Sequence, residues 1–346
     1  MSEPVRSVLV YSMGEVIGDG LIKLPVVGAV RDAFPRARIT WCAAKGSSVY
    51  AGALAPVVKG CIDEILTTGP TGAGALDWLT ARRPFGGRRF DVVIDTQDNL
   101  RRSLVARRAA ERLFVSAAGG GRLSHRPVGE LPVPVVERLT ALVSLAAGWP
   151  IKPRPLRVLD ERAVEAAAAL LPEGPSYVGF APMAGGVSRR WPLDRFIDLA
   201  LRQTAKGRTP VFFLGPTDLV PMLAVRSALP YALIPEHERT DAYQDVAGPL
   251  LVIALAGRLR AAVANDAGPG HMLAAGGVPL VSLQLDRRKS LKFKPAAERV
   301  ERLIAEDFID REANLLTAER RPDPGMAAIP VSAVEARLER LLEGPS

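Results

Sequence analysis

The chain has 346 residues, of which 48% are hydrophobic and 24% charged, so it can form two packed cores and lacks the composition of a largely unfolded protein. Its net charge of +8, carried mostly by arginine, is compatible with nucleic acid, anionic lipid or a phosphorylated substrate and does not choose among them. The first apolar run spans only Val8 to Tyr11, no later run approaches the roughly 20 residues of a membrane span, and Cys42 and Cys61 fit neither a zinc site nor a disulfide framework. From these features we expect a soluble, cytoplasmic protein that is not exported, membrane-spanning or disulfide-rich.

Short apolar runs alternate with helical patterns through residues 1–150. The runs Val8–Tyr11, Ile39–Cys42 and Asp91–Asp95 are rich in β-branched residues and predict strands. Helical spacing of apolar residues predicts helices over Leu24–Phe34 and Leu100–Ala110. This alternation predicts a first α/β domain with a parallel sheet.

A proline-rich segment separates this pattern from a second one. Residues Gly148–Pro155 contain three prolines, which lack the N–H groups that helices and sheets require, so we predict a linker there. The second domain is predicted over 151–330, and its alternating helices and strands are Glu161–Leu171, Tyr177–Phe180, Leu193–Lys206, Pro210–Leu214, Ala261–Ala264 and Pro279–Leu283. Helical spacing over Val331–Leu342 predicts, for 331–346, a final helix packed on either domain. The fold class is therefore α/β, with two doubly wound Rossmann-like domains whose strand ends face a cleft.

The first candidate site follows the first strand. The segment Gly14–Gly20 contains three glycines, which allow the backbone to turn tightly, and it places Asp19 before a predicted helix that begins near Leu24-Pro25. A carboxylate there can accept a proton from a substrate hydroxyl. Asp19 could instead only cap the helix, and Glu15 on the same loop is a rival base.

The second candidate site is the segment Phe180–Pro192, in which glycines and two adjacent arginines follow a strand. Backbone N–H groups together with Arg189 and Arg190 are suited to a pyrophosphate, because guanidinium groups match phosphate oxygens. Taken alone, such a pair can equally be a solvated surface feature.

The third candidate site is the run Ala261–Ala275, where a strand leads through a polar, glycine-rich turn into an alanine-rich helix. The turn reads Asn-Asp-Ala-Gly-Pro-Gly-His from Asn265 to His271. Free N–H groups at the helix start and the helix dipole stabilise an anion. A lone histidine is usually structural, but His271 lies on the turn itself beside Asp266, which makes this segment the most specific of the three.

The order of these three segments resembles the bacterial heptosyltransferases, glycosyltransferase family 9, which build the inner core of lipopolysaccharide from ADP-heptose. The resemblance covers most of the chain from Val8 to about Leu283 and depends most on the late turn. Further matching segments are Val26–Phe34, Ala37–Trp41, Val93–Arg101 and Trp191–Phe196.

The resemblance implies a GT-B fold with an acceptor-binding domain over 1–150, a nucleotide-sugar donor-binding domain over 151–330 and an inverting reaction between them. It implies Asp19 as the catalytic base and Arg189, Asp266, Gly268 and His271 as donor-binding residues. We further predict Ser188, Ala267 and Pro269 as donor-binding and Glu15, Gly18 and Arg101 as acceptor-binding residues. The nucleotide-sugar is a substrate, ADP-linked and heptose-like, and neither a metal nor another cofactor is expected, because cations and helix dipoles replace the metal in this fold.

The chain departs from the family pattern at the donor loop. Ala267 stands where a threonine or serine is usual, Gly270 replaces a bulkier residue, and Gln284–Ser290 replaces the familiar Phe-Gly-Pro-Thr run. An alternative function is therefore a catalytically idle nucleotide-binding or envelope-assembly protein on the same fold. A nucleic-acid surface has little support, since aromatic residues are only 5% of the chain.

The first domain is rich in arginine. The residues concerned are Arg82, Arg83, Arg88, Arg89, Arg101, Arg102, Arg107 and Arg108. Such a surface would attract a phosphorylated, lipid-linked acceptor and bring the protein to the anionic inner face of the inner membrane, although an ordinary solvated surface explains it equally well.

Overall fold

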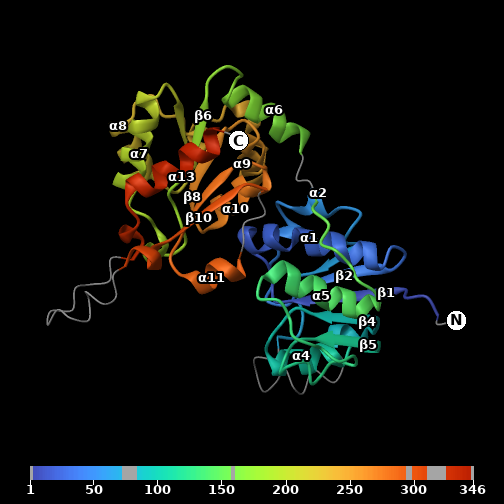
Figure 1. Cartoon of the computed structure of the whole chain (residues 1–346). Helices are drawn as coiled ribbons and strands as arrows, with labels where there is room; N and C mark the ends of the chain where they lie inside the picture. The colour runs from blue at the N-terminus through green and yellow to red at the C-terminus, as the bar shows by residue number, and fades with distance from the viewer. Residues whose placement is uncertain (1–2, 72–83, 157–159, 294–297, 310–324, 344–346) are drawn as a thin grey trace. The chain divides into compact units, whose positions relative to one another are not determined.

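The computed structural model describes residues 3–71, 84–156, 160–293, 298–309 and 325–343 (Figure 1). The chain divides into two compact units, Met1–Arg157 and Val158–Ser346, and each has its own sheet. In the described ranges, no helix is both long enough and apolar enough to cross a membrane.

The sheet of the first unit is five-stranded and parallel, with the order β3-β2-β1-β4-β5. Its strands are β1 (Ser7–Ser12), β2 (Arg38–Ala43), β3 (Glu64–Leu66), β4 (Phe90–Asp95) and β5 (Ala110–Ser116). The chain order reverses at β1 and β4, so the sheet is doubly wound as predicted. β3 and β5 were not expected, because β3 is short and β5 begins with the adjacent charged residues Glu111 and Arg112.

The helices of the described part of the first unit are α1 (Ile17–Ala33), α2 (Ala55–Val58), α4 (Leu100–Arg107) and α5 (Val135–Ala147). A 3₁₀ turn spans Val49–Ala51, and Pro84–Gly87 forms a turn in which Phe85 and Gly86 have positive φ. α1 and α5 pack side by side on the sheet (Figure 1).

The start of α1 differs from the sequence prediction. The helix begins at Ile17, not near Leu24, and Pro25 lies inside it. An internal proline costs a helix about 3 kcal/mol. Here the burial of most of the apolar side chains of α1 offsets that cost, and the Arg154 N–H donates to the Pro25 carbonyl at 3.0 Å. Asp19 therefore lies in the first turn of a helix and not on a loop.

The sheet of the second unit is also five-stranded and parallel, with the order β10-β9-β8-β6-β7. Its strands are β6 (Tyr177–Ala181), β7 (Thr209–Phe212), β8 (Ala261–Asn265), β9 (Leu280–Gln284) and β10 (Val300–Ile304). The prediction of two doubly wound α/β units is thus confirmed.

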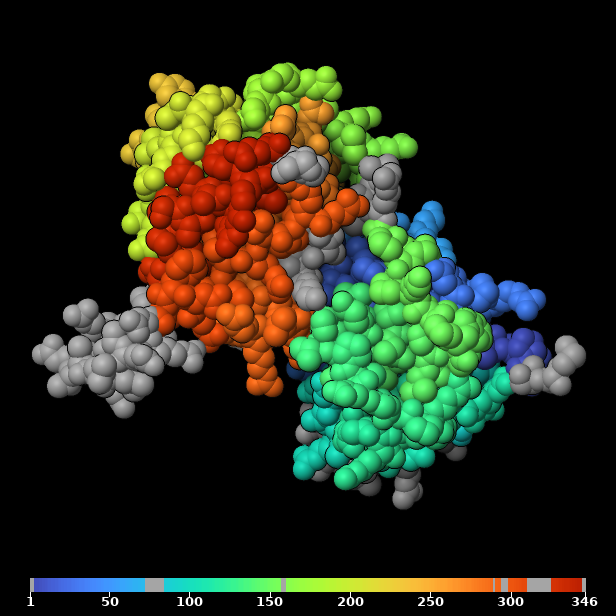
Figure 2. Space-filling model, in the orientation of Figure 1, coloured from blue at the N-terminus to red at the C-terminus, as the bar shows by residue number. Residues whose placement is uncertain are grey.

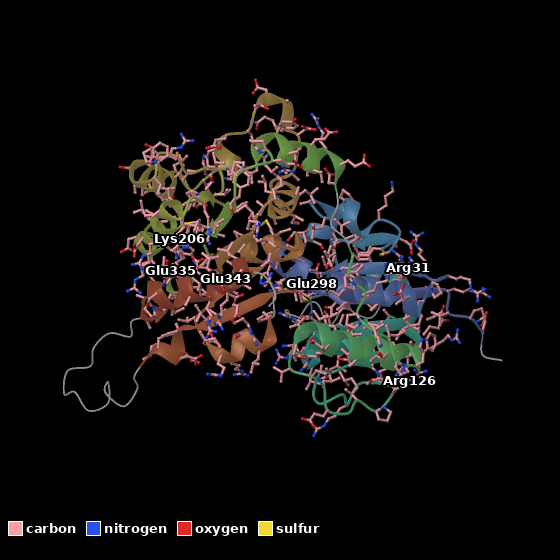
Figure 3. All side chains as sticks on the ribbon, turned by 45° about the horizontal axis from the view of Figure 1, so that its top comes forward. Arg31, Arg126, Lys206, Glu298, Glu335 and Glu343 are labelled. Atoms are coloured by element: carbon pink, nitrogen blue, oxygen red, sulfur yellow. The ribbon has the colours of Figure 1, made fainter. Side chains whose placement is uncertain are left out.

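Within its described residues, the helices of the second unit are α6 (Glu161–Leu170), α7 (Leu193–Ala205), α8 (Leu219–Ala228), α9 (Gly248–Ala256), α10 (Gly268–Ala275), α11 (Arg287–Lys292) and α13 (Val331–Glu343). The predicted final helix, α13, packs on this unit and buries Val334, Leu338 and Leu341 in its core. Figure 2 shows α13 (red) on the outside of the unit, and it contacts α7. Lys206, just after α7, pairs with Glu335 of α13 at 2.8 Å, and Figure 3 labels both residues.

Candidate functional site

The late turn joins the end of β8 to the start of α10. Asn265 is the last residue of β8, and Ala267 is the N-cap of α10 with extended backbone. No side chain caps this helix, so the N–H groups of its first turn remain available to a ligand. Pro269, in the first turn, has no N–H to satisfy. The turn therefore has the geometry of an anion site.

Asn265 brings the second candidate segment to this turn. Its side-chain oxygen accepts a hydrogen bond from the Trp191 N–H at 3.0 Å, and its Nδ2 donates to the Pro182 carbonyl at 2.6 Å. Asn265 is 1% exposed. One buried amide thus holds both ends of the loop 182–191 against the late turn, and the two sequence motifs form one site within the second unit.

The two arginines of the loop have different environments. Ser188 and Arg189 are exposed on a 3₁₀ turn. The Arg189 backbone N–H donates to the Gly186 carbonyl at 3.0 Å, but its guanidinium makes no hydrogen bond or ion pair with any residue that the structure describes. Its side chain passes over Gly185, where a Cβ would come within 3.5 Å of Arg189 Nη2. The Nε of Arg190 instead donates to the Ala184 carbonyl at 2.8 Å. Arg189 is therefore the available cation, and Arg190 supports the loop.

His271 is buried in the first turn of α10. It is 8% exposed, and burial lowers the pKa of its imidazole to about 4, so the ring is neutral near pH 7. Its Nε2 lies 3.6 Å from Asp266 Oδ1, and its Nδ1 has no hydrogen-bond partner in the described part of the chain. A neutral ring can donate or accept one hydrogen bond but cannot supply charge at neutral pH.

Gly270 explains one departure from the family pattern. A Cβ at this position would lie 2.8 Å from the Asn265 carbonyl oxygen and 3.2 Å from the Ala264 side chain. Glycine thus lets α10 start directly against the end of β8.

A cavity of about 190 Å³ opens beside the late turn, and the sequence did not predict it. Its walls are mainly apolar and come from the end of β7 and the starts of α9 and α10, and they include Phe213, Pro249, Pro269 and Met272. Glu236 is a carboxylate on this wall, and Arg239 Nη2 donates to it at 2.7 Å. The only local signal was the proline- and glycine-rich character of the segments that form it.

In the first unit, Asp19 is exposed in the first turn of α1. The alternative role as a helix cap is wrong, because the N-cap is Val16 and no side chain caps the helix. The Asp19 side chain makes no hydrogen bond or ion pair with another residue of the described ranges, whereas Gly18 and Gly20 on either side are buried. The carboxylate is therefore accessible to a substrate.

Glu15 has the opposite environment, although it was predicted as an acceptor-binding residue and rival base. It is 3% exposed, and both of its oxygens accept hydrogen bonds. Burial, and secondarily the charge of Glu15, raises the pKa of Cys42 to about 12. The structure thus separates the two carboxylates of this segment into one accessible and one buried group.

The predicted basic surface is partly neutralised. Arg88 forms a bidentate pair with Glu64, which lowers the pKa of that carboxyl to about 2, and Arg89 donates to the Ala110 carbonyl. Arg101 and Arg107 remain exposed on α4, and neither pairs with a carboxylate of the described residues. Arg82 and Arg83 lie outside the described residues.

Comparison with known families matches the chain to "Glycosyltransferase family 9 (heptosyltransferase)" over residues 78–307. The chain belongs to glycosyltransferase family 9. No curated protein sequence is a significant match. Among solved structures, a family 9 glycosyltransferase from Veillonella parvula DSM 2008 is similar with a TM-score of 0.70 at 18% identity, covering 100% of this chain and 99% of that one.

Two E. coli structures are also similar to the present chain, the family 9 glycosyltransferase of 346 residues. ADP-heptose lps heptosyltransferase II has a TM-score of 0.64 at 17% identity, with 98% of each chain covered. Heptosyltransferase WaaC with ADP has a TM-score of 0.63 at 15% identity, covering 97% of this chain and 99% of that one. At these identities the likeness establishes the shared fold.

A second buried carboxylate of this glycosyltransferase, Asp95, ends β4. It is fully buried and accepts hydrogen bonds from the Ser103 hydroxyl, from the Ser116 hydroxyl at 2.8 Å and from the Gln97 N–H at 2.9 Å. Burial outweighs these bonds and raises the pKa of Asp95 to about 6. Asp95 therefore joins β4 to α4 and to the end of β5. Asp95 lies in the segment Val93–Arg101, which resembles the family, but no role was predicted for it from the sequence.

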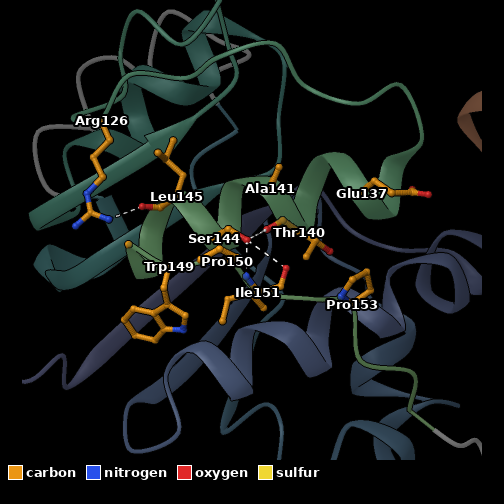
Figure 4. A pocket seen from close by; sticks show the side chains of 11 residues that line it. Arg126, Glu137, Thr140, Ala141, Ser144, Leu145, Trp149, Pro150, Ile151 and Pro153 are labelled. Carbon is orange, nitrogen blue, oxygen red and sulfur yellow. Dashed lines mark hydrogen bonds between the residues drawn. The ribbon is translucent and has the colours of Figure 1, made fainter.

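A groove of the first unit follows α5 and contains none of the predicted site residues. It has a volume of about 880 Å³ and lies between α5 and the return segment 149–153 (Figure 4). Arg126 donates to the Leu145 carbonyl at 2.5 Å, and the Ile151 N–H donates to Ser144 Oγ at 2.9 Å. These two hydrogen bonds hold neighbouring segments against the C-terminal end of α5. Among the described residues, no cluster of three His, Cys, Asp or Glu could hold a metal ion.

Proposed function

We propose that this family 9 glycosyltransferase transfers a heptose-like sugar from an ADP-linked donor to a lipopolysaccharide-core or other envelope saccharide, with inversion and without a metal. One observation supports this proposal most. Within the second unit, the loop that carries the exposed guanidinium of Arg189 lies against the start of α10, which no side chain of the described residues caps. The solved structures of similar fold include one with ADP.

The diphosphate of the donor binds at Arg189 and at the N–H groups of α10. A bidentate guanidinium–phosphate contact and the helix dipole both favour the diphosphate dianion. As the bond to the sugar breaks, negative charge grows on the leaving diphosphate, and these groups stabilise it in place of a metal ion. Asp266 and His271 complete the turn as a carboxylate and a neutral hydrogen-bonding ring.

The nucleoside of the donor occupies the cavity beside the late turn. Apolar walls that include Phe213 and Met272 suit the face of a nucleobase, and the carboxylate of Glu236 can accept hydrogen bonds from ribose hydroxyls. Because Arg239 already donates to Glu236, that carboxylate is fixed before the ligand arrives.

Asp19 acts as the general base. It takes the proton from an acceptor hydroxyl as the hydroxyl oxygen attacks the anomeric carbon, while the bond from that carbon to the diphosphate oxygen breaks on the opposite side. The products are the extended saccharide, the nucleoside diphosphate and a protonated carboxyl. This geometry inverts the anomeric centre.

The acceptor carries anionic groups that the exposed arginines of α4 attract, and Arg101 is the predicted contact among them. In this proposal the protein works in the cytoplasm and meets its acceptor at the inner face of the inner membrane, where basic groups gain about 1 kcal/mol each from anionic lipid.

The test is transfer from ADP-heptose to a deacylated core acceptor by the protein and by Asp19→Asn, in buffer with EDTA. Asp19→Asn should lower kcat by roughly 10²–10⁴-fold with ADP affinity unchanged, because only basicity is lost. Activity that requires an added divalent cation would contradict the mechanism. ADP binding without transfer to any core acceptor would favour the idle nucleotide-binding alternative, for which the missing hydroxyl at Ala267 is the main support.

A further inference from the structure

The buried carboxylate of Glu15 is a junction of four elements. Its Oε1 accepts hydrogen bonds from Ser12 Oγ at 2.5 Å, Lys23 Nζ at 3.1 Å and Trp41 Nε1 at 3.2 Å. Its Oε2 accepts one from Ser48 Oγ at 2.7 Å. These donors belong to β1, α1, β2 and the N-cap of the first 3₁₀ turn, so a single side chain connects all of them.

The backbone around Glu15 is tied to the same turn. The Val49 N–H donates to the Glu15 carbonyl at 3.1 Å, and Glu15 forms a β-bridge with Ser48. Gly14 has φ of +126°, and a Cβ there would lie 2.5 Å from the Ser47 carbonyl oxygen. The segment that leads into α1 therefore has one conformation open to it, and only glycine allows it.

The first turn of α1 has few other polar attachments. Its N-cap, Val16, provides no side-chain cap. Lys23 lies one helical turn beyond Asp19, and it also donates to Ser12 Oγ at 3.2 Å. Tyr50 Oη donates to the Gly20 carbonyl at 2.8 Å, and a Cβ at Gly20 would lie 2.3 Å from the Val49 side chain. The helix start is thus pressed against the turn that Glu15 organises.

The Asp19 side chain makes no hydrogen bond or ion pair in the described ranges, and its charge acts on the Tyr50 hydroxyl, which itself bonds to Gly20 of α1. The direction of its carboxylate therefore depends on the frame of α1. A displacement of about 1 Å in a catalytic group can cost about 100-fold in rate. Loss of the Glu15 hydrogen bonds would therefore displace the first turn of α1, or make it more mobile, without changing Asp19 itself.

We propose that Glu15 is a positioning residue for the transfer reaction, acting through Lys23 and Ser48 to fix the first turn of α1 and thereby Asp19. The inference rests on the proposed role of Asp19 as the base. Glu15 itself donates or accepts no proton in the reaction, because all of its contacts are with the protein and it is buried.

The first test separates positioning from catalysis. Glu15→Gln keeps the size of the side chain but leaves Lys23 without a counter-charge, and it should lower kcat about 10- to 100-fold while ADP affinity stays as in the parent protein. The pH dependence of kcat should keep its acidic limb, since the proposed base, Asp19, is retained. The double variant Glu15→Gln/Lys23→Gln removes the uncompensated charge and should recover part of the loss. Glu111→Gln, an exposed carboxylate of the same unit, is the matched control.

The second test does not depend on transfer. Hydrogen–deuterium exchange of peptides covering residues 13–24 should be faster in Glu15→Gln than in the parent protein, with exchange of the late turn unchanged. Unchanged exchange of residues 13–24 would overturn the positioning role, whatever the outcome for the proposed function. A kcat of Glu15→Gln equal to that of the parent protein, measured below the melting temperature of the variant, would also overturn the positioning role. So would a pH profile of kcat that loses its acidic limb in Glu15→Gln but keeps it in Asp19→Asn. If exchange accelerates but Asp19→Asn keeps full activity, the junction is real and the choice of Asp19 as base is wrong.

Discussion

Asp95 gives a pH dependence of stability whose sign and size follow from the structure. Its pKa is raised from 3.8 to about 6, so the folded protein binds the proton more tightly than the unfolded chain. Between these two pKa values the folded state holds more protons, and stability therefore falls as pH rises. The contribution is fully present below pH 3.8 and is lost as pH rises through about 6.

The substitution Asp95→Asn removes this titration while keeping a side chain of the same shape that can bond to Ser103 and Ser116. Two pKa units correspond to about 3 kcal/mol in total, of which about 1.4 kcal/mol falls between pH 5 and pH 7.5. The free energy of unfolding of the parent protein, minus that of the variant, should therefore be about 1.4 kcal/mol smaller at pH 7.5 than at pH 5. A constant offset from the substitution cancels in this difference.

The assay is urea unfolding at both pH values, with hydrogen exchange of β4 used to identify the transition of the first unit. Glu111→Gln serves as the control, since its carboxylate is exposed. A difference that stays constant with pH, or grows toward pH 7.5, would refute the reasoning and show that the three hydrogen bonds outweigh burial.

Three further predictions concern the donor site. Arg189→Ala should weaken ADP binding about 10- to 150-fold in calorimetry, because a charge-assisted contact of about 1.5–3 kcal/mol is lost, whereas Arg190→Ala should weaken it less because that guanidinium bonds to the loop. The imidazole of His271 should show no titration by NMR from pH 5.5 to 8, since burial lowers its pKa to about 4, and a titration in that range would mean that the ring is hydrated. Ala267→Thr restores a hydroxyl at the donor loop and should tighten ADP binding up to about 10-fold, from a hydrogen bond of about 0.5–1.5 kcal/mol; weaker binding would place the phosphates elsewhere.

The sequence was sufficient for the fold class and for the three segments that carry the candidate site. Strand and helix periodicities are local properties, and so is a glycine-rich turn after a strand, so β1, β6, β8 and α13 could be predicted from neighbouring residues alone. The start of α1 could not, because the local penalty of Pro25 predicts a boundary that burial of the helix face overrides.

The environment of each candidate residue depended on contacts between distant parts of the chain. Sequence placed both Asp19, the predicted base, and Glu15, its rival, on one segment. Only the tertiary structure separates them, because the partners that bury Glu15, Trp41 and Ser48, lie 26 and 33 residues away. Likewise, Arg189 and the late turn become one site through Asn265, which bonds across 74 residues to Trp191. The sequence determines which side-chain groups are present. Their solvent accessibility and hydrogen-bond partners are set only by folding, which excludes water from the Glu15 carboxylate and leaves the Asp19 carboxylate exposed.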